Sequence, residues 1–273
     1  MIAITSKELI GLIMAFLWPL TRILGLIAIA PPFGNSSIPA RIKIAFGVVL
    51  ALIITPGIPP FTEADPISLS GIMILMQQFV IGLGMGFIMR LVFAAIEMAG
   101  TLTGMTMGLG FASFFDPQTR GNTSAIAQFL VLVATVLFFS LNVHHALLIA
   151  LMDSFRTIPI SMTLNSGFDF HRLAIWGEQI FIYGLKLSIP LVTALLLTNV
   201  ALGILTRAAP QLNIFGIGFT ITISVGLLIL GMILPYLALP MEILFQHGID
   251  AIQSLGTSVQ HTLPQKLKLL PSP

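Results

Sequence analysis

Five ionisable residues stand inside strongly apolar stretches, where a charge is costly and usually serves a function. They are Arg22, Arg90, Glu97, Glu178 and Lys186. Arg90 and Glu97 are seven residues apart and Glu178 and Lys186 are eight apart, so each pair shares roughly one helix face. Such groups could relay protons, but a proton transporter usually carries acidic residues in several spans. Each could instead pair with another helix or a partner subunit, or extend toward a wet surface. We expect the five side chains to be buried at contacts between subunits.

The other arrangements that could support chemistry are weaker. His144 and His145 are adjacent, so on a helix their rings point about 100° apart and cannot easily bind one metal ion. We expect them to form hydrogen bonds near a helix end, with Asn142. Ser113, Asp116 and His144 are the residue types of a hydrolytic triad, but nothing in their spacing supports one. The sequence therefore predicts no catalytic residue, no cofactor and no metal site.

Two ladders of glycine must position the helices that carry these groups. The first ladder contains Gly82 and Gly86, and the second contains Gly100, Gly104 and Gly108. Glycines four residues apart remove the side chains from one helix face, which lets another backbone approach closely. We expect all five glycines to be helix-packing positions.

The second ladder leads into a segment rich in methionine and phenylalanine. Its members are Met105, Met107, Phe111, Phe114, Phe115 and Asp116, and Pro117 follows. The Asp-Pro pair favours a turn, and unbranched methionine side chains adapt to irregular or changing surfaces. The segment is typical of a moving or sealing part rather than of an anchor.

The composition places the chain in a membrane. Hydrophobic residues make up 56% of it and charged residues 8%, against about 25% charged in a soluble domain. Apolar blocks of about 20 residues recur, and the length allows about six spans. The absence of cysteine excludes disulfides and thiolate chemistry. The net charge of +2 includes no run of Lys and Arg, which argues against nucleic-acid binding.

One apolar tract, residues 69–115, is too long for a simple span. As a single helix it would be about 70 Å long, roughly twice the thickness of the hydrocarbon layer. It must bend back, tilt strongly or extend beyond the bilayer, and the sequence does not choose among these. The basic residues of the predicted loops are divided almost evenly between the two sides of the membrane. Enclosure by partner subunits would produce this weak topology signal.

These features together resemble the FliR family, a membrane component of the flagellar type III protein export apparatus. The likeness runs from about Trp18 to about Pro240. Its marks are Trp18-Pro19-Leu20-Thr21-Arg22, Ile38 through Lys43, Gln77-Gln78 with the glycine run, Met107 through Pro117, Asn142 through His145, and Ala208 through Phe215. No single mark is diagnostic, but their order and spacing are specific.

The resemblance implies an all-α, membrane-associated export-gate subunit built of long helical hairpins. About residues 1–170 would be FliP-like, about 171–262 would form a FliQ-like hairpin, and 263–273 would be a flexible tail. One such chain would close a helical ring of FliP and FliQ copies, with FlhB against the base of the ring. The loop that matches Met105 to Asn122 would plug the pore, with the phenylalanine rings as the blocking side chains.

The resemblance also implies a function and a place in the cell. The chain would be a multi-pass protein of the bacterial inner membrane, in the flagellar basal body. It would help to form and close the pore through which unfolded flagellar proteins are exported, and it would not be an enzyme. The alternative is a small-molecule or ion transporter that acts without FliP and FliQ.

Overall fold

The structure is a computed structural model and describes residues 6–58, 68–109, 124–161, 170–208 and 218–256. Within these ranges the chain forms helices and no strand, so the predicted all-α fold is confirmed. In chain order the elements are α1 (Ser6–Ile29), α2 (Ala40–Ile54), the short 3₁₀ helix η1 (Thr55–Gly57), α3 (Leu69–Thr106), α5 (Ala125–Ser140), α6 (Val143–Thr157), α7 (Phe170–Trp176), α8 (Gln179–Ala208) and α9 (Phe219–Ser254).

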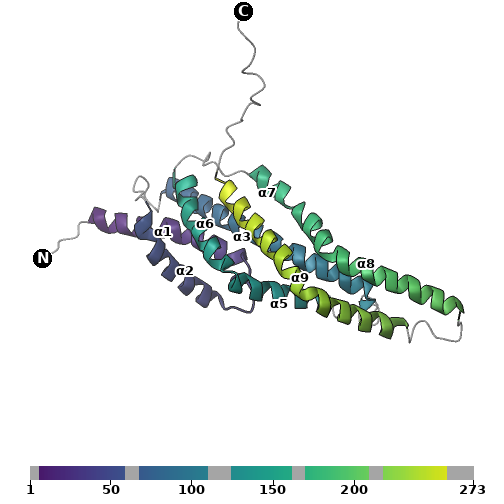
Figure 1. The fold of residues 1–273 in the computed structure, drawn as a ribbon. Coiled ribbons are helices and arrows are strands. Elements are labelled where there is room, and N and C mark those ends of the chain that lie inside the picture. Colours follow the sequence, from purple (N-terminus) through teal and green to yellow (C-terminus); the bar gives the residue numbers. More distant parts are fainter. Residues whose placement is uncertain (1–5, 59–67, 110–123, 162–169, 209–217, 257–273) are drawn as a thin grey trace, which may run out of the picture.

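Helix α3 is the central element of the molecule, and other long helices lie along it (Figure 1). It begins at an N-cap, where the Ser68 Oγ accepts a hydrogen bond from the Gly71 backbone N–H at 3.1 Å. It then runs unbroken for 38 residues to Thr106. At 1.5 Å per residue it is about 57 Å long, nearly twice the ~30 Å hydrocarbon layer. The tract 69–115 therefore does not bend back before Thr106, and α3 must tilt or extend beyond the bilayer.

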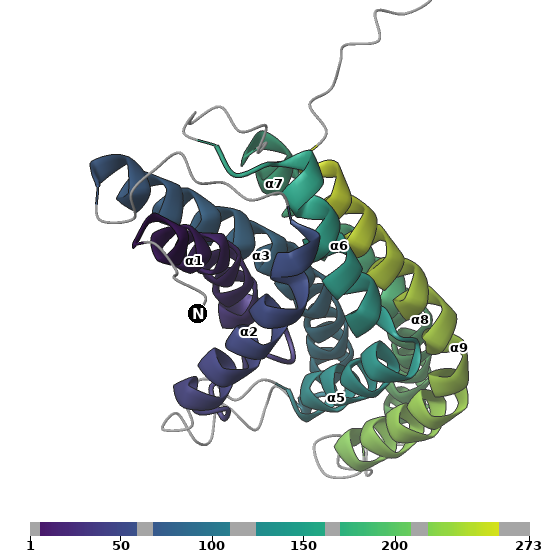
Figure 2. The ribbon, with the colours of Figure 1, turned by 90° about the vertical axis from the view of Figure 1, so that its left-hand side faces the viewer.

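The neighbours of α3 bury most of its surface. It contacts α1, α5, α7, α8 and α9, with α1 and α2 on one side and α8 and α9 on the other (Figure 2). In its most apolar window 67% of the residues are buried inside the chain, against 22% for α9. Helix α3 is thus a core helix, whereas α9 turns most of its apolar surface outward.

A triangle of phenylalanine rings joins three of these helices in the core. The ring centroids of Phe93 and Phe138 are 5.9 Å apart, those of Phe93 and Phe245 are 5.6 Å apart, and those of Phe138 and Phe245 are 5.8 Å apart. These separations and the tilted ring planes are favourable for aromatic pairs. The triangle fixes the middle of α3 against α5 and α9.

The number of spans differs from the sequence-based expectation of about six. Four helical stretches of the described chain are long and apolar enough to cross a membrane, namely Ala40–Gly57, Leu69–Thr106, His171–Ala208 and Phe219–Ser254. A fifth span results if α5 and α6, which are bent by 67° at a short break, are counted as one. The difference lies at α1, whose apolar stretch in the described chain, Ala15–Ile29, is shorter than a span.

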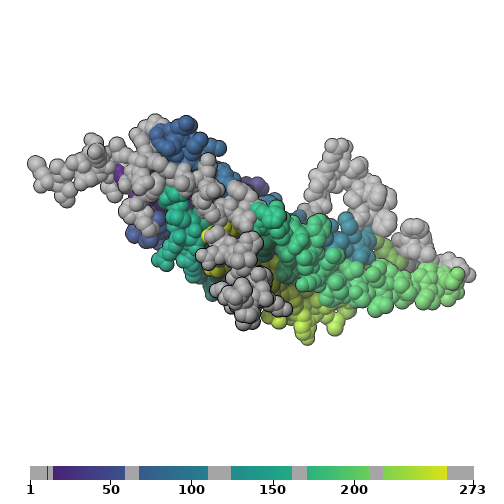
Figure 3. Space-filling model, turned by 90° about the horizontal axis from the view of Figure 1, so that it is seen from above, coloured from purple at the N-terminus to yellow at the C-terminus, as the bar shows by residue number. Residues whose placement is uncertain are grey.

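The outer faces of α8 and α9 carry exposed apolar side chains. Leu197 and Met232 are each 67% exposed, and Tyr236 is 78% exposed. Seen from above, α8 forms a continuous ridge that reaches one end of the molecule (Figure 3). An apolar surface of this size must be covered by lipid or by other proteins.

The contact between α1 and α3 is unusually close because glycines line it. A Cβ atom at Gly82 would overlap the backbone carbonyl of Arg22, and one at Gly86 would lie 2.8 Å from the backbone oxygen of Leu26. The contact is reciprocal, since a Cβ at Gly25 of α1 would lie 2.5 Å from the backbone oxygen of Phe79. Two backbones therefore touch directly along this crossing, as small residues allow in membrane helices.

Replacing Gly82 with alanine should destabilise the chain, although alanine is the better helix former. The added methyl group collides with backbone and should cost about 1–3 kcal/mol. The matched control is Gly203→Ala in α8, where a Cβ meets nothing within 4 Å. There the substitution should be neutral or stabilising by up to about 1 kcal/mol. Thermal unfolding of the purified chain in detergent measures both, and equal shifts of the two midpoints would contradict the close contact.

Candidate functional site

Arg22 lies at the centre of the α1–α3 crossing and is completely buried, with 0% of its surface exposed. Its backbone carbonyl lies against Gly82, while its side chain extends to Gln78, one helical turn earlier on α3. The guanidinium also lies 4.1 Å from the centre of the Phe155 ring of α6. A cation buried among three helices needs polar partners, because burial removes it from water.

Those partners come from the same chain and use each nitrogen of the guanidinium. Nε and one Nη donate to the Gln78 Oε1 at 2.8 and 2.5 Å. The other Nη donates to the Ser154 backbone oxygen at 2.8 Å and to its Oγ at 3.0 Å. A further bond reaches the Ile158 backbone oxygen at 2.9 Å. Arg22 is thus satisfied inside the chain, which corrects the expectation that it meets a neighbouring subunit.

The arginine closes the C-terminal end of α6. The last backbone carbonyls of a helix have no partner within the helix, and the helix dipole makes that end negative. Ser154 lies in the last turn of α6 and Ile158 is its C-cap residue. A guanidinium from α1 supplies the missing donors and an opposite charge. We refer to Arg22, Gln78, Ser154 and Ile158 as the arginine junction, which ties α1, α3 and α6 together.

Two buried donors near the junction have no hydrogen-bond partner among the described residues. They are the Nε2 of Gln78 and the Nε1 of Trp18, which lies one turn before Arg22 on α1. Trp18 is completely buried and packs against Ile74 of α3. Gln78 is therefore held in place mainly by its bonds to Arg22, so the orientation of its side chain depends on the arginine.

A second close contact holds the C-terminal end of α3. Met107 is completely buried, and a Cβ at Gly226 of α9 would lie 2.6 Å from its Cε. The missing side chain at Gly226 therefore leaves the space that Met107 fills. Met107 was expected to line a pore plug, but the structure places it in the core of the chain. Met105, by contrast, is 63% exposed.

The glycines of the second ladder have two different roles. A Cβ at Gly100 would collide with the backbone of Ala127, and one at Gly104 would collide with the Oγ of Ser124. Both therefore pack α3 against the beginning of α5. Gly108 differs, because it lies beyond the last helical residue and has a φ of 85°, a left-handed conformation that favours glycine. Its role is to end the helix and not to pack it.

The remaining predicted plug residues, Phe111, Phe114, Phe115 and Asp116, lie outside the described residues. The structure does place the two ends of the segment that contains them. Leu109 packs against the hydrophobic core at one end, and Ser124 contacts Gly104 at the other. Residues 110–123 therefore leave and rejoin the folded chain where α3 and α5 meet.

The other four predicted charges are exposed in the chain on its own. Arg90 and Glu97 lie on an exposed part of α3, and Glu178 and Lys186 are exposed at the beginning of the α8 region. The Lys186 Nζ lies 5.3 Å from the centre of the Tyr183 ring, and the Tyr183 hydroxyl forms a hydrogen bond with the His247 Nδ1 of α9. These positions leave the four charges available to neighbours, and their burial between subunits stays a prediction.

The described residues do not assemble a reaction centre. His144 is half-buried in α6, and the other two members of the imagined triad, Ser113 and Asp116, lie outside the described residues. No group of three or more His, Asp and Glu side chains in the described part of the chain could hold a metal ion.

Sequence reasoning identified Arg22 but missed its partners. Ser154 and Ile158 are 132 and 136 residues away in the sequence, and no local pattern connects them with Arg22. Gln78 lies inside an apolar tract, and a buried amide there indicates a polar partner. Gly226 was missed because it has no ladder of neighbouring glycines on α9.

The fold and the junction together define a class of protein. The chain is a multi-pass helical membrane protein whose buried polar groups join helices, and its outer apolar faces are open to lipid or to other proteins.

The chain belongs to the family described as bacterial export proteins, family 1, which matches residues 13–248. The flagellar biosynthetic protein FliR of Pectobacterium carotovorum subsp. carotovorum is 42% identical over 95% of this chain and 99% of the relative. FliR of Escherichia coli (strain K12) is 37% identical over 93% and 97%. FliR of Bacillus subtilis (strain 168) is 30% identical over 91% and 97%.

This membership confirms the predicted resemblance to the FliR family and the predicted location. The chain is a membrane component of the flagellar export apparatus, in the inner membrane at the basal body. Its four or five candidate spans agree with a multi-pass protein.

Replacing Arg22 with methionine should strongly destabilise the chain. Methionine fills similar space but leaves the acceptors of the junction without donors, at about 1–3 kcal/mol for each orphaned group. Arg22→Lys should be intermediate, because an ammonium cannot form the forked bonds of a guanidinium.

The control for this experiment is Arg90→Met, which removes an exposed arginine from α3 and should change the stability by no more than about 0.5 kcal/mol. Denaturation of the purified proteins in detergent compares them. An Arg22→Met variant that is as stable as Arg90→Met would show that the junction does not hold the helices.

Proposed function

We propose that this chain is a subunit of the flagellar type III export gate. It helps to form, and to close, the conduit through which unfolded flagellar proteins leave the cytoplasm. The observation that carries the proposal is the anchoring of residues 110–123 at both ends, in a chain that belongs to an export family. A closing segment needs fixed ends, so that its bulky side chains stay over the pore.

The support for a plug comes from the contacts on either side of it. Met107 fills the space at Gly226, and Gly104 packs directly on Ser124, so α3, α5 and α9 are locked together at this point. The segment between these contacts carries Phe111, Phe114 and Phe115. Three uncharged rings can exclude water and ions from a narrow passage, since hydrated ions do not enter an apolar constriction without cost.

The proposed partners are FliP and FliQ, in a helical ring that holds one copy of this chain, and FlhB at the base of the ring. The exposed apolar faces of α8 and α9 supply surface for such neighbours. The exposed charges Arg90, Glu97, Glu178 and Lys186 would pair with groups on these subunits. In this proposal residues 1–170 correspond to a FliP-like part and residues 171–262 to a FliQ-like hairpin.

The proposal gives the chain no catalytic role. It forms part of a passage, and the energy for export comes from other components of the apparatus. The arginine junction then has a mechanical purpose, because it keeps α1, α3 and α6 in register while substrates pass.

Replacing Phe111, Phe114 and Phe115 together with alanine should make the resting gate leak ions. The measurement is the conductance of membranes that contain the assembled gate. The control is Phe129→Ala with Phe139→Ala, which removes two exposed rings from α5 and should leave conductance unchanged. A triple variant that assembles normally and conducts no more than the control would rule out the plug.

Native mass spectrometry after mild extraction should find one copy of this chain in a larger assembly of small helical membrane proteins. Co-expression with FliP, FliQ and FlhB supplies the proposed partners. A stable monomer or homodimer, with all three partners present and unbound, would refute the proposal and favour a transporter that acts alone.

A further inference from the structure

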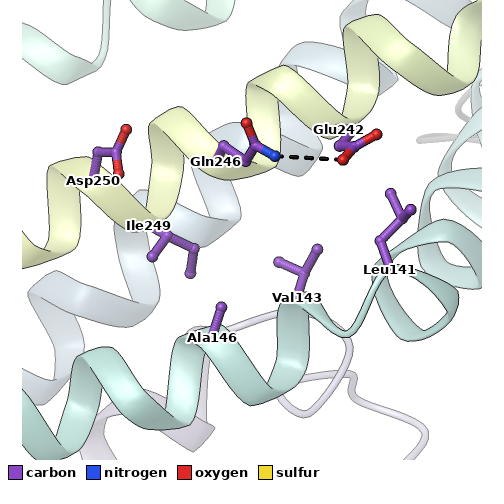
Figure 4. A pocket seen from close by; sticks show the side chains of 7 residues that line it. All are labelled: Leu141, Val143, Ala146, Glu242, Gln246, Ile249 and Asp250. Atoms are coloured by element: carbon purple, nitrogen blue, oxygen red, sulfur yellow. Dashed lines mark hydrogen bonds between the residues drawn. The ribbon is translucent and has the colours of Figure 1, made fainter.

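A small groove lies between α9 and the junction of α5 with α6 (Figure 4). Its volume is about 220 Å³. The residues that line it are Leu141, Val143, Ala146, Glu242, Gln246, Ile249 and Asp250. None of these residues belongs to the arginine junction, so the groove is a separate feature.

The groove combines an apolar floor with an acidic rim. Leu141, Val143 and Ala146 come from the α5–α6 side, and Glu242 and Asp250 come from α9 (Figure 4). The two carboxylates lie eight residues apart, on one face of the helix. Gln246 lies between them and donates a hydrogen bond to the Glu242 Oε1 at 3.4 Å. Among the described residues that line the groove there is no Lys or Arg, so this lining is negatively charged.

The position of the groove along α9 places it in water or among lipid head groups. Residues 219–241 of α9 contain no Asp, Glu, Lys or Arg. This stretch is about 35 Å long as a helix, which is enough to cross the hydrocarbon layer of ~30 Å. Glu242 follows directly after it and Asp250 comes eight residues later, where a charged rim can be solvated and can attract a cationic group.

The C-terminal part of the chain has the matching chemistry. Residues 257–273 contain Lys266 and Lys268 and no Asp or Glu, and Leu267 and Leu269 alternate with the lysines. In an extended strand, alternate residues point to opposite sides. Such a strand can place its leucines on an apolar floor. The lysines then lie on its other side, and their long side chains can bend toward carboxylates at the rim.

The segment also starts close enough to reach the groove. Gly256 lies 6 residues after Asp250 and 14 after Glu242, which corresponds to about 9 and 21 Å along a helix axis. The ten residues from 257 to 266 can span up to about 33 Å when extended. A tether of this length gives an effective concentration in the millimolar range, so weak contacts suffice for binding.

We propose that residues 257–273 fold back along α9 and bind in this groove, with leucines on its apolar floor and Lys266 and Lys268 paired with Glu242 and Asp250. The occupied groove joins the end of α9 to the α5–α6 junction. The C-terminal segment is therefore an intramolecular clasp between these two parts of the chain.

Cysteine cross-linking tests the clasp directly, because the natural chain contains no cysteine. Ala146→Cys in the groove is combined with Leu267→Cys in the segment, and Ile249→Cys provides a second groove position. The full chain is oxidised in membranes that contain the complete export apparatus. A disulfide needs Cα atoms within about 7 Å, so we expect rapid formation of an intrachain cross-link.

The position control is Ile243→Cys with Leu267→Cys, since Ile243 is exposed on α9 but does not line the groove. Equal cross-linking at positions 146, 249 and 243 would overturn the proposal, because it would show a segment that visits the surface at random. A cross-link from position 146 to another protein or to a second copy, in place of the intrachain product, would assign the groove to that occupant and would also overturn it.

The charge pairing has its own test in the same cross-linking assay. Glu242→Gln with Asp250→Asn should slow the reaction of the groove pair about two- to tenfold, as expected for the loss of two solvent-exposed ion pairs. Asp153→Asn removes a carboxylate of α6 that does not line the groove and should leave the rate unchanged. A rate that falls equally in the double variant and in this control, or in neither, contradicts the pairing.

Discussion

The direct backbone contact between α1 and α3 is the constraint on which the rest of the structure depends. Because Gly82 has no side chain, the carbonyl of Arg22 can lie against α3, and this position aims the arginine side chain along α3 toward Gln78. The same guanidinium then reaches the end of α6. A larger residue at position 82 would move α1 outward, and the bonds to all three acceptor residues would lengthen together.

The features that were predictable from sequence are those that depend on local spacing. Apolar tracts predicted helices, and glycines four residues apart predicted close packing at a position such as Gly100, because helical periodicity alone decides which residues share a face. What could not be predicted depends on tertiary contacts. Two partners of Arg22, Ser154 and Ile158, lie more than 130 residues away, and Met107 is buried only because α9 presents Gly226 opposite to it. The conformation of Gly108 depends on where α3 ends, and a run of apolar residues does not show that point.

Burial is distributed unevenly, and this has consequences for stability. Helix α3 is largely enclosed by its own chain, whereas α8 and α9 expose leucine, isoleucine and methionine along much of their length. In a membrane, lipid tails are as apolar as these side chains, so the hydrophobic effect does not drive helices together there. Close backbone contacts and buried hydrogen bonds must hold the inner helices in place. This explains why the glycines and the one completely buried arginine of the described chain occur at the same crossing.

The separation of Arg22 from its acceptors in the sequence also determines how the chain must be made. Gln78 emerges from the ribosome 56 residues after Arg22, and Ser154 follows only after 132 residues. At about 5–20 residues per second, the arginine waits on the order of ten seconds for the end of α6. During that interval the guanidinium lacks the hydrogen-bond acceptors that α6 supplies, so α1 has to stay near water, at the membrane surface or in the insertion machinery. Helix α1 is therefore among the last of the described helices to reach its final depth.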